Sequence, residues 1–366
     1  MNDFIIPENP GGLPHIRDPR DLPYELYKQV AGAVAGERPA QYFANISQLH
    51  KANQFFIGSC VGQATDKAKE YGELQEGDLV DLSARYIYAH CKRIDGYPGQ
   101  GTYLATALKV LSERGTCLDS QFPNSAVSQD HEKYIDLSLA DPNADETAKE
   151  ARISGYAFVS TSWDSICDAL WRQGVVVLCS AGTNVGWREQ PLRPPQPGEP
   201  VWYHCYMAFG YDENFIYFRN SWGEYWGLPM PYDGCGKFAP NYIQHLSAAA
   251  TIVDMSDELR KWLQQLPSPT PIEKSIAQVQ SVFGSTWRPA PKVEQYAFRE
   301  GKVAYVKVLG SKKPYQVYSL GYGGYKETAW SFLKTFKTLN QEGIVGDIQP
   351  WQARALGILD DDAQPA

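Results

Sequence analysis

The sequence lacks any long apolar run, and no segment approaches the roughly 18 consecutive apolar residues that a membrane-spanning helix needs. Its opening, Met1 to Pro7, has neither a basic stretch nor a long apolar core, which argues against a secretion signal. The chain also lacks a metal-ligand motif, a phosphate-binding glycine loop and a carboxylate pair in convincing context. We therefore expect no membrane partner, no metal and no cofactor.

A disulfide framework is lacking too, because the chain has seven cysteines, an odd number, and their spacing follows no regular pattern. We expect reduced thiols, with Cys91–Cys117 as the only pairing that merits a test. For most of these residues a small, inert, buried side chain is the ordinary interpretation. That interpretation applies to Cys91, Cys117, Cys167, Cys179 and Cys235.

One cysteine stands in a different context, because Gly58 and Ser59 precede Cys60 and an apolar stripe follows it as far as Leu74. The stripe recurs at intervals of three and four residues, which predicts a helix. Cys60 is then placed at the helix N-terminus, where free N–H groups and the helix dipole favour a thiolate. A side-chain amide six residues earlier, on Gln54, can assist the Cys60 N–H in binding an oxyanion.

A base for this thiol is expected 144 residues further on, at His204. Aromatic and apolar residues at 201–211 and 215–219 flank a polar turn, which predicts a hairpin. Antiparallel pairing brings Asn220 within roughly 5–8 Å of His204, where it can orient the imidazole ring. A lone histidine in such a strand is more often a satisfied core residue. The order and spacing of cysteine, histidine and asparagine favour nucleophilic catalysis instead.

These residues resemble the papain-like cysteine peptidases, and more closely their divergent bacterial and phage members. The resemblance covers residues 13–253, and the run from Asn220 to Gly227 is its most specific part. It implies Cys60 as nucleophile, His204 as base and acid, Asn220 as orienter and Gln54 as oxyanion donor. Substrate contacts are implied for a further group of positions, namely Gly58, Ser59, Gly101, Thr102, Tyr203 and Trp222.

The chain departs from the family pattern in three places. Ile57 replaces a cysteine that secreted members often carry, Val61 follows the nucleophile, and bulky Tyr203 precedes the histidine. A family disulfide is therefore missing, and subsite preferences do not carry over. The residues before Gln54 are too few for a long helical propeptide, so latency is expected from an inserted loop, the C-terminal region or a partner.

Helical patterns precede strand patterns within residues 1–253. This order predicts an α+β, papain-like fold with a helical lobe and a β-rich lobe. We interpret residues 254–275 as a short helix and a proline-rich linker, and 276–366 as a small α+β domain. Residues 286–340 hold ten Lys/Arg and three Glu, although the whole chain carries a net charge of −8. A basic domain of this kind suggests an anionic or assembly partner, although a solvated basic face is the commoner explanation.

Two classes of function remain open on this reading. The first is a cysteine peptidase that hydrolyses a peptide or protein substrate through a thioester, as an endopeptidase rather than an exopeptidase. The second is a catalytically silent scaffold within a larger assembly such as a virion. The expected location is the cytoplasm or such an assembly.

Overall fold

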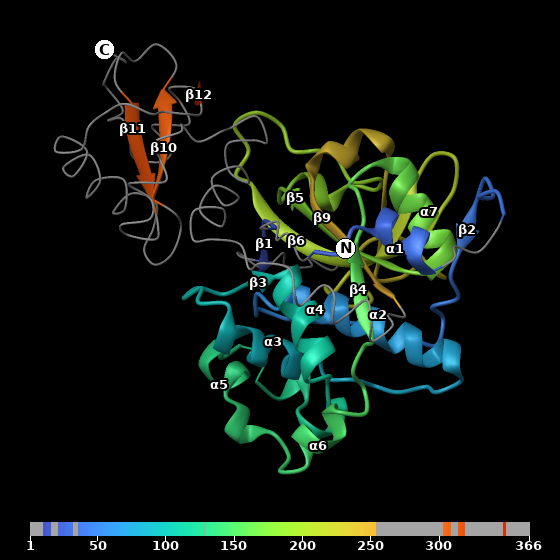
Figure 1. Ribbon diagram of the computed structural model, residues 1–366, viewed down its shortest axis with the longest axis vertical. Coiled ribbons are helices and arrows are strands. Elements are labelled where there is room, and N and C mark those ends of the chain that lie inside the picture. The colour runs from blue at the N-terminus through green and yellow to red at the C-terminus, as the bar shows by residue number, and fades with distance from the viewer. Residues whose placement is uncertain are drawn as a thin grey trace. The chain divides into compact units, whose positions relative to one another are not determined.

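The computed structural model describes residues 10–15, 21–31, 36–127, 129–253, 303–308, 314–318 and 347–348. The chain divides into two compact units. The larger comprises Met1–His15 and Asp21–Gln265, and the smaller comprises Ile16–Arg20 and Leu266–Ala366. Within the larger unit helices α2 to α6 gather in one lobe, and most strands lie in the other together with α1 and α7 (Figure 1).

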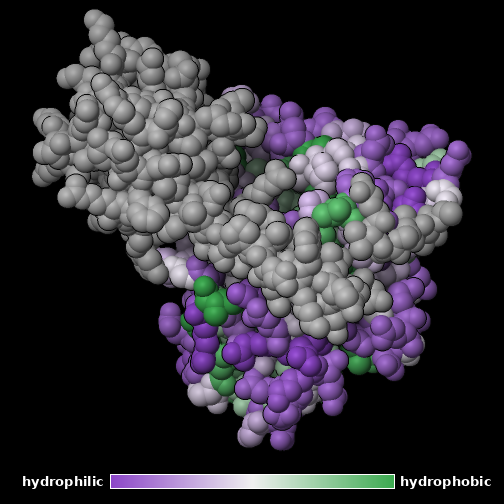
Figure 2. All heavy atoms as spheres, viewed as in Figure 1, coloured by the Kyte–Doolittle hydropathy of each residue, from purple (hydrophilic) through white to green (hydrophobic). Residues whose placement is uncertain are grey.

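The helical lobe is built around α2, whose bounds are Cys60–Glu76. Gly77 ends this helix in a left-handed conformation, φ 98°, which glycine adopts without strain. Ser83 caps the next helix by accepting a hydrogen bond from Tyr86 N. The further helices of this lobe are α3 (Ala84–Ile94), α4 (Leu104–Glu113), α5 (His131–Ile135) and α6 (Ala144–Ala148). Its visible surface is mainly hydrophilic, with scattered hydrophobic side chains (Figure 2).

The β-rich lobe contains a seven-stranded sheet in the order β4-β9-β5-β6-β7-β8, with β2 paired to β6. All pairings in this sheet are antiparallel. The strands are β2 (Tyr42–Phe43), β4 (Gly155–Phe158), β5 (Val176–Gly182), β6 (Trp202–Tyr211), β7 (Ile216–Arg219), β8 (Cys235–Phe238) and β9 (Leu246–Val253). The predicted α+β class is therefore confirmed.

The two faces of this sheet bury different partners. On β5, Val177 packs in one core cluster with Val61 of α2, while Val176 packs in another with Ile166 of α7 (Trp163–Gln173). This alternation follows from the two-residue repeat of a strand. It explains why every residue of β5 is buried. The sheet thus holds the N-terminus of α2 against β6.

The remaining elements are short. The described residues between 119 and 148 contain two short α-helices and three 3-10 helices, and Asp130 and Asp136 cap α5 and η3 by accepting hydrogen bonds from Lys133 N and Ser138 N. The 3-10 helices are η1 (Asp119–Gln121), η2 (Asn124–Val127), η3 (Leu137–Leu139), η4 (Gly186–Arg188) and η5 (Pro240–His245). The others are β1 (Gly12–Leu13), α1 (Tyr24–Ala31) and β3 (Thr102–Tyr103).

The expectation of uniformly reduced thiols is wrong. Cys179 on β5 and Cys205 on β6 form a disulfide, whereas Cys91 and Cys117 are free and buried. The strand register places Cys179 directly opposite Cys205. The bridge therefore depends on cross-strand pairing, which the sequence separation of the cysteines does not reveal.

In the smaller unit, β10 (Val303–Val308) pairs antiparallel with β11 (Pro314–Tyr318) and parallel with β12 (Asp347–Ile348). These strands lie within residues 276–366, for which a small α+β domain is predicted. The short helix and the linker predicted over 254–275 lie outside the described residues. Among the described helices, none is long and apolar enough to cross a membrane.

Candidate active site

Cys60 is the first residue of α2 and is fully buried. Its Sγ lies 3.3 Å from the backbone nitrogen of Cys205, whose N–H donates to the sulfur. Cys205 follows His204 on β6, so this contact brings the thiol to the strand that carries the predicted base. The predicted position at a helix N-terminus is the position observed.

His204 and Asn220 meet at the open end of the β6–β7 hairpin. His204 Nε2 lies 2.6 Å from Asn220 Oδ1, which also accepts a hydrogen bond from Ser221 N at 2.8 Å. Because the amide oxygen can only accept, Nε2 carries the proton and donates it. His204 Nδ1 is then the basic nitrogen, and it makes no hydrogen bond within the described residues.

Aromatic rings enclose this pair. The Trp222 indole stacks on His204 with 4.7 Å between ring centroids and an interplanar angle of 28°. Trp187 meets the imidazole edge-on at 5.1 Å and is fully buried. The family resemblance implied Trp222 as a substrate contact, whereas its indole packs on the imidazole, and nothing in the sequence singled out Trp187. Such rings exclude water and strengthen the buried hydrogen bond.

Gln54 is held on both sides of its amide. Its Oε1 accepts hydrogen bonds from Ser221 Oγ at 2.7 Å and Trp222 Nε1 at 3.2 Å. These contacts turn Nε2 outward, where it donates to Ile57 O at 2.7 Å and Pro10 O at 2.8 Å. A carbonyl oxygen from another segment thus occupies the donor that sequence analysis assigned to an oxyanion.

That segment is the described N-terminal stretch Pro10–Leu13, which lies across the candidate site. Gly11 sits against Gly58 so closely that a Cβ atom there would lie 1.8 Å from Gly58 O. A Cβ on Gly12 would lie 3.0 Å from the backbone nitrogen of His204. Only glycines permit this approach. Residues upstream of position 13, where the family resemblance begins, therefore also contact the candidate site.

The cleft contacts continue at β3, which pairs in parallel with β1. Thr102 N donates to Gly11 O at 3.0 Å, so the predicted substrate-binding backbone at Thr102 already binds this chain's own segment. Gly101 is engaged internally, because its N–H donates to Tyr88 Oη and its oxygen accepts from Lys92 Nζ. Tyr88 and Lys92 are supports that sequence analysis missed, since nothing local marks them.

The other residues predicted to contact substrate differ in burial and in hydrogen-bond partners. Gly58 N donates to Gln100 Oε1 at 2.7 Å, which fixes the turn before the thiol. Ser59 is fully buried and accepts a hydrogen bond from Tyr134 Oη at 3.3 Å, so its hydroxyl faces the helical lobe interior. Tyr203 is half-buried on β6 beside His204.

Burial sets the electrostatics of the covered site. It raises the pKa of the Cys60 thiol to about 12, against the opposing backbone N–H of Cys205. It lowers the pKa of His204 to about 3, against the opposing hydrogen bond to Asn220. At neutral pH the covered pair is thus thiol and neutral imidazole. The expected thiolate–imidazolium pair requires water to reach the site.

Solved structures resemble the fold of this chain, although no family model and no curated protein matches it. Xylellain, a cysteine protease from Xylella fastidiosa, superposes with a TM-score of 0.57 at 21% identity, covering 70% of this chain and 99% of its own. The fold is papain-like. Digestive procathepsin L 3 of Tenebrio molitor larval midgut has a TM-score of 0.50 at 20% identity and covers 67% of this chain and 76% of its own. The papain-like fold predicted from the sequence is thereby confirmed.

Proposed function

We propose that this chain is a cysteine peptidase that cleaves peptide bonds within extended substrates. Cys60 attacks the carbonyl carbon, His204 takes the thiol proton and later gives it to the leaving amine, and water hydrolyses the thioester. Gln54 Nε2 and the Cys60 N–H stabilise the oxyanion. The observation that carries the proposal is the meeting of three groups: a helix-terminal thiol against β6, a histidine with a free Nδ1, and the Asn220 amide 2.6 Å from its Nε2.

Within this proposal, Pro10–Leu13 keeps the enzyme latent. The segment occupies Gln54 Nε2, takes the Thr102 N–H and lies against the His204 backbone, and both reacting side chains are fully buried. A substrate must displace it before its own carbonyl reaches the oxyanion donors. Activity then depends on how readily this short segment leaves.

A silent scaffold is the second candidate, favoured by the complete burial and neutrality of Cys60 and His204. The two candidates differ once the cleft is opened. Gly11→Ala adds a Cβ that collides with Gly58 O, at a position whose φ of 102° already disfavours alanine. Gly198→Ala is the matched control, because φ there is 87° but no atom lies within 4 Å.

The test is covalent labelling by a peptidyl epoxide, located by peptide mapping, together with turnover of a fluorogenic peptide. Gly11→Ala is expected to raise both rates at least about tenfold over wild type, with the label on Cys60 alone and Gly198→Ala unchanged. Cys60→Ala in the same background removes both signals. An opened, folded chain that neither reacts nor turns over peptide supports the scaffold instead.

A further inference from the structure

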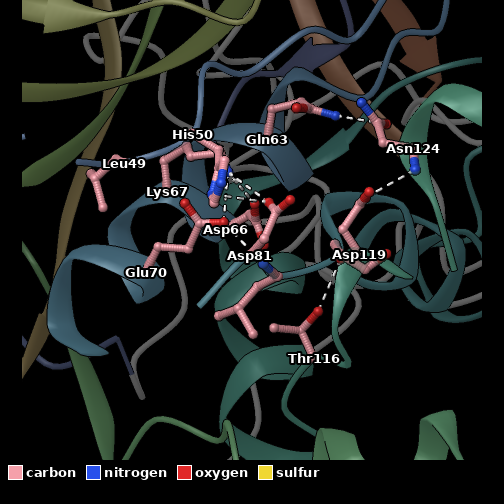
Figure 3. Close-up of polar contacts among 12 residues, drawn as sticks. Leu49, His50, Gln63, Asp66, Lys67, Glu70, Asp81, Thr116, Asp119 and Asn124 are labelled. Carbon is pink, nitrogen blue, oxygen red and sulfur yellow. Dashed lines mark hydrogen bonds and ion pairs between the residues drawn. The ribbon is translucent and has the colours of Figure 1, made fainter. Parts of the chain in front are cut away.

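A buried acidic cluster lies on α2, some two turns beyond Cys60, and is separate from the candidate active site. Asp66 and Glu70 come from this helix and are each about 1% exposed, while Asp81 comes from the loop that follows it. Lys67, itself 5% exposed, lies among them. Figure 3 shows these side chains converging beneath His50.

Lys67 satisfies only part of this cluster. Its Nζ lies 2.6 Å from Glu70 Oε1, 3.2 Å from Asp66 Oδ2 and 3.9 Å from Asp81 Oδ1. Glu70 Oε1 also accepts from Leu82 N at 3.0 Å. Within the described residues, Glu70 Oε2 and Asp66 Oδ1 accept no hydrogen bond. Buried carboxylate oxygens without donors are costly, so they call for a proton or a cation.

The net charge of the cluster also favours a bound cation. Three carboxylates face one ammonium, which leaves two negative charges when all the groups are ionised. A divalent cation supplies the two missing charges without a proton.

A nitrogen ligand completes the cluster. His50 Nδ1 lies 3.5 Å from Asp81 Oδ1, and ligand atoms of His50, Glu70 and Asp81 all lie within 4.8 Å of one another. Ligand atoms around one tetrahedral zinc ion are about 3.4 Å apart, as bonds of about 2.1 Å require. The side chains of His50 and Asp81 are 52% and 47% exposed, so they can rotate inward and leave an access route for the ion.

We infer that His50, Glu70 and Asp81 bind a divalent cation of the Zn²⁺ class, with Asp66 as an additional buried negative charge. The ion takes Glu70 Oε2, while Lys67 keeps Oε1. One imidazole nitrogen among carboxylates suits zinc better than calcium or magnesium, which favour all-oxygen sites. The site ties α2, which begins at Cys60, to the segment that runs from His50 to Gln54. It thereby braces the two sources of the candidate oxyanion hole.

The test measures zinc binding by metal-stripped, full-length protein with calorimetry, independently of peptidase activity. Wild type is expected to bind one equivalent of zinc. His50→Ala and Asp81→Asn are each expected to lower the zinc affinity at least about 100-fold. Both substituted side chains are about half exposed, so we expect the variants to fold. His245→Ala and Asp78→Asn are the matched controls, because these residues lie outside the cluster, and their binding is expected to equal that of wild type.

Two further readouts identify the ligands. Zinc is expected to raise the unfolding temperature of wild type but not of His50→Ala. Cobalt in place of zinc is expected to give no thiolate-to-metal charge-transfer band, since no cysteine belongs to the cluster. Absence of zinc binding overturns the inference, as do equal affinities in all variants, a strong charge-transfer band, or binding of Ca²⁺ in preference to Zn²⁺.

Discussion

Two side chains at the candidate active site hold the Gln54 amide in a single orientation. Ser221 Oγ and Trp222 Nε1 both donate to its Oε1, so Nε2 has to face the opposite way, where it donates to Ile57 O and Pro10 O. Such preorganisation lets a donor stabilise charge without rearranging during the reaction. Ser221, the residue after Asn220, therefore supports the proposed oxyanion donor Gln54.

Substitutions at these residues are expected to lower turnover unequally in the Gly11→Ala background. Gln54→Ala should lose about 10²–10³-fold in kcat, because an oxyanion donor is removed. Ser221→Ala should lose about tenfold, because Trp222 still holds the amide. Steady-state kinetics check this, with Ser247→Ala, whose hydroxyl donates to Cys179 O, as control. Equal rates for Gln54→Ala and its parent would remove Gln54 from the site.

His204 makes the covered state sensitive to acid. Burial lowers its pKa to about 3, whereas an exposed histidine titrates near 6.5. The covered form therefore binds fewer protons than the open form between about pH 3 and 6.5. It follows that the open form gains stability as the pH falls through that range.

The expected signature is a ratio of labelling rates. The rate for Gly11→Ala divided by the rate for wild type should shrink as the pH falls from 7 to 5, because wild type opens more readily. The ratio cancels the pH dependence of the labelling chemistry itself. A ratio that stays constant across this range would show that His204 protonation does not drive opening.

At the scale of elements, the disulfide joins the two central strands directly beside the candidate site. Cys179 and Cys205 are register partners, and the next pair along the same strands is Ser180 and His204. The bridge therefore anchors the strand position of the histidine. It also closes a loop between residues 26 apart, which restricts the unfolded chain.

Thiol counting and stability measurements test this bridge. Alkylation of unfolded, unreduced protein should add five groups, and seven after reduction, since five cysteines are free. The double variant Cys179→Ala/Cys205→Ala should lose about 3–4 kcal/mol of unfolding free energy. A reductant should destabilise wild type and leave the double variant unchanged. Seven additions without reductant would contradict the pairing.

For the whole molecule, the division at Gln265 separates the candidate site from the basic C-terminal part. The proposed catalytic residues all lie between Gln54 and Asn220, in the larger unit. The excess of ten Lys/Arg over three Glu at residues 286–340 lies in the smaller one. The predicted role of that part, attachment to an anionic partner or assembly, stays a prediction.

Truncation separates these roles. A chain ending at Gln265, with Gly11→Ala, should cleave a small peptide within about twofold of the full-length variant, because it keeps the whole site. Only the full-length chain should bind a heparin column, and added salt should weaken that binding by screening surface charges over about 8–10 Å. Salt-independent retention would indicate apolar docking, and a folded but inactive truncated chain would mean that the C-terminal part completes the site.

The sequence by itself determined what depends on neighbours along the chain. The apolar stripe after Cys60 and the two apolar runs around residue 213 predict the α2 helix and the β6–β7 hairpin because helices and hairpins are local structures. Hairpin register alone brings His204 to Asn220. The offset of Gln54 and the run from Asn220 to Gly227 further indicated the papain-like fold.

Only the tertiary structure decided what depends on segments distant in the chain. Pro10–Leu13 reaches Gly58 and His204, and Cys179 faces Cys205. His50, Glu70 and Asp81 converge as well. No periodic pattern in the sequence indicates any of these contacts. The protonation states of Cys60 and His204 likewise could not be predicted from the sequence, because the position of Cys60 at a helix N-terminus by itself favours a thiolate. Burial of the two side chains outweighs the helix dipole, since desolvation of a charge costs more than the field of one helix end provides.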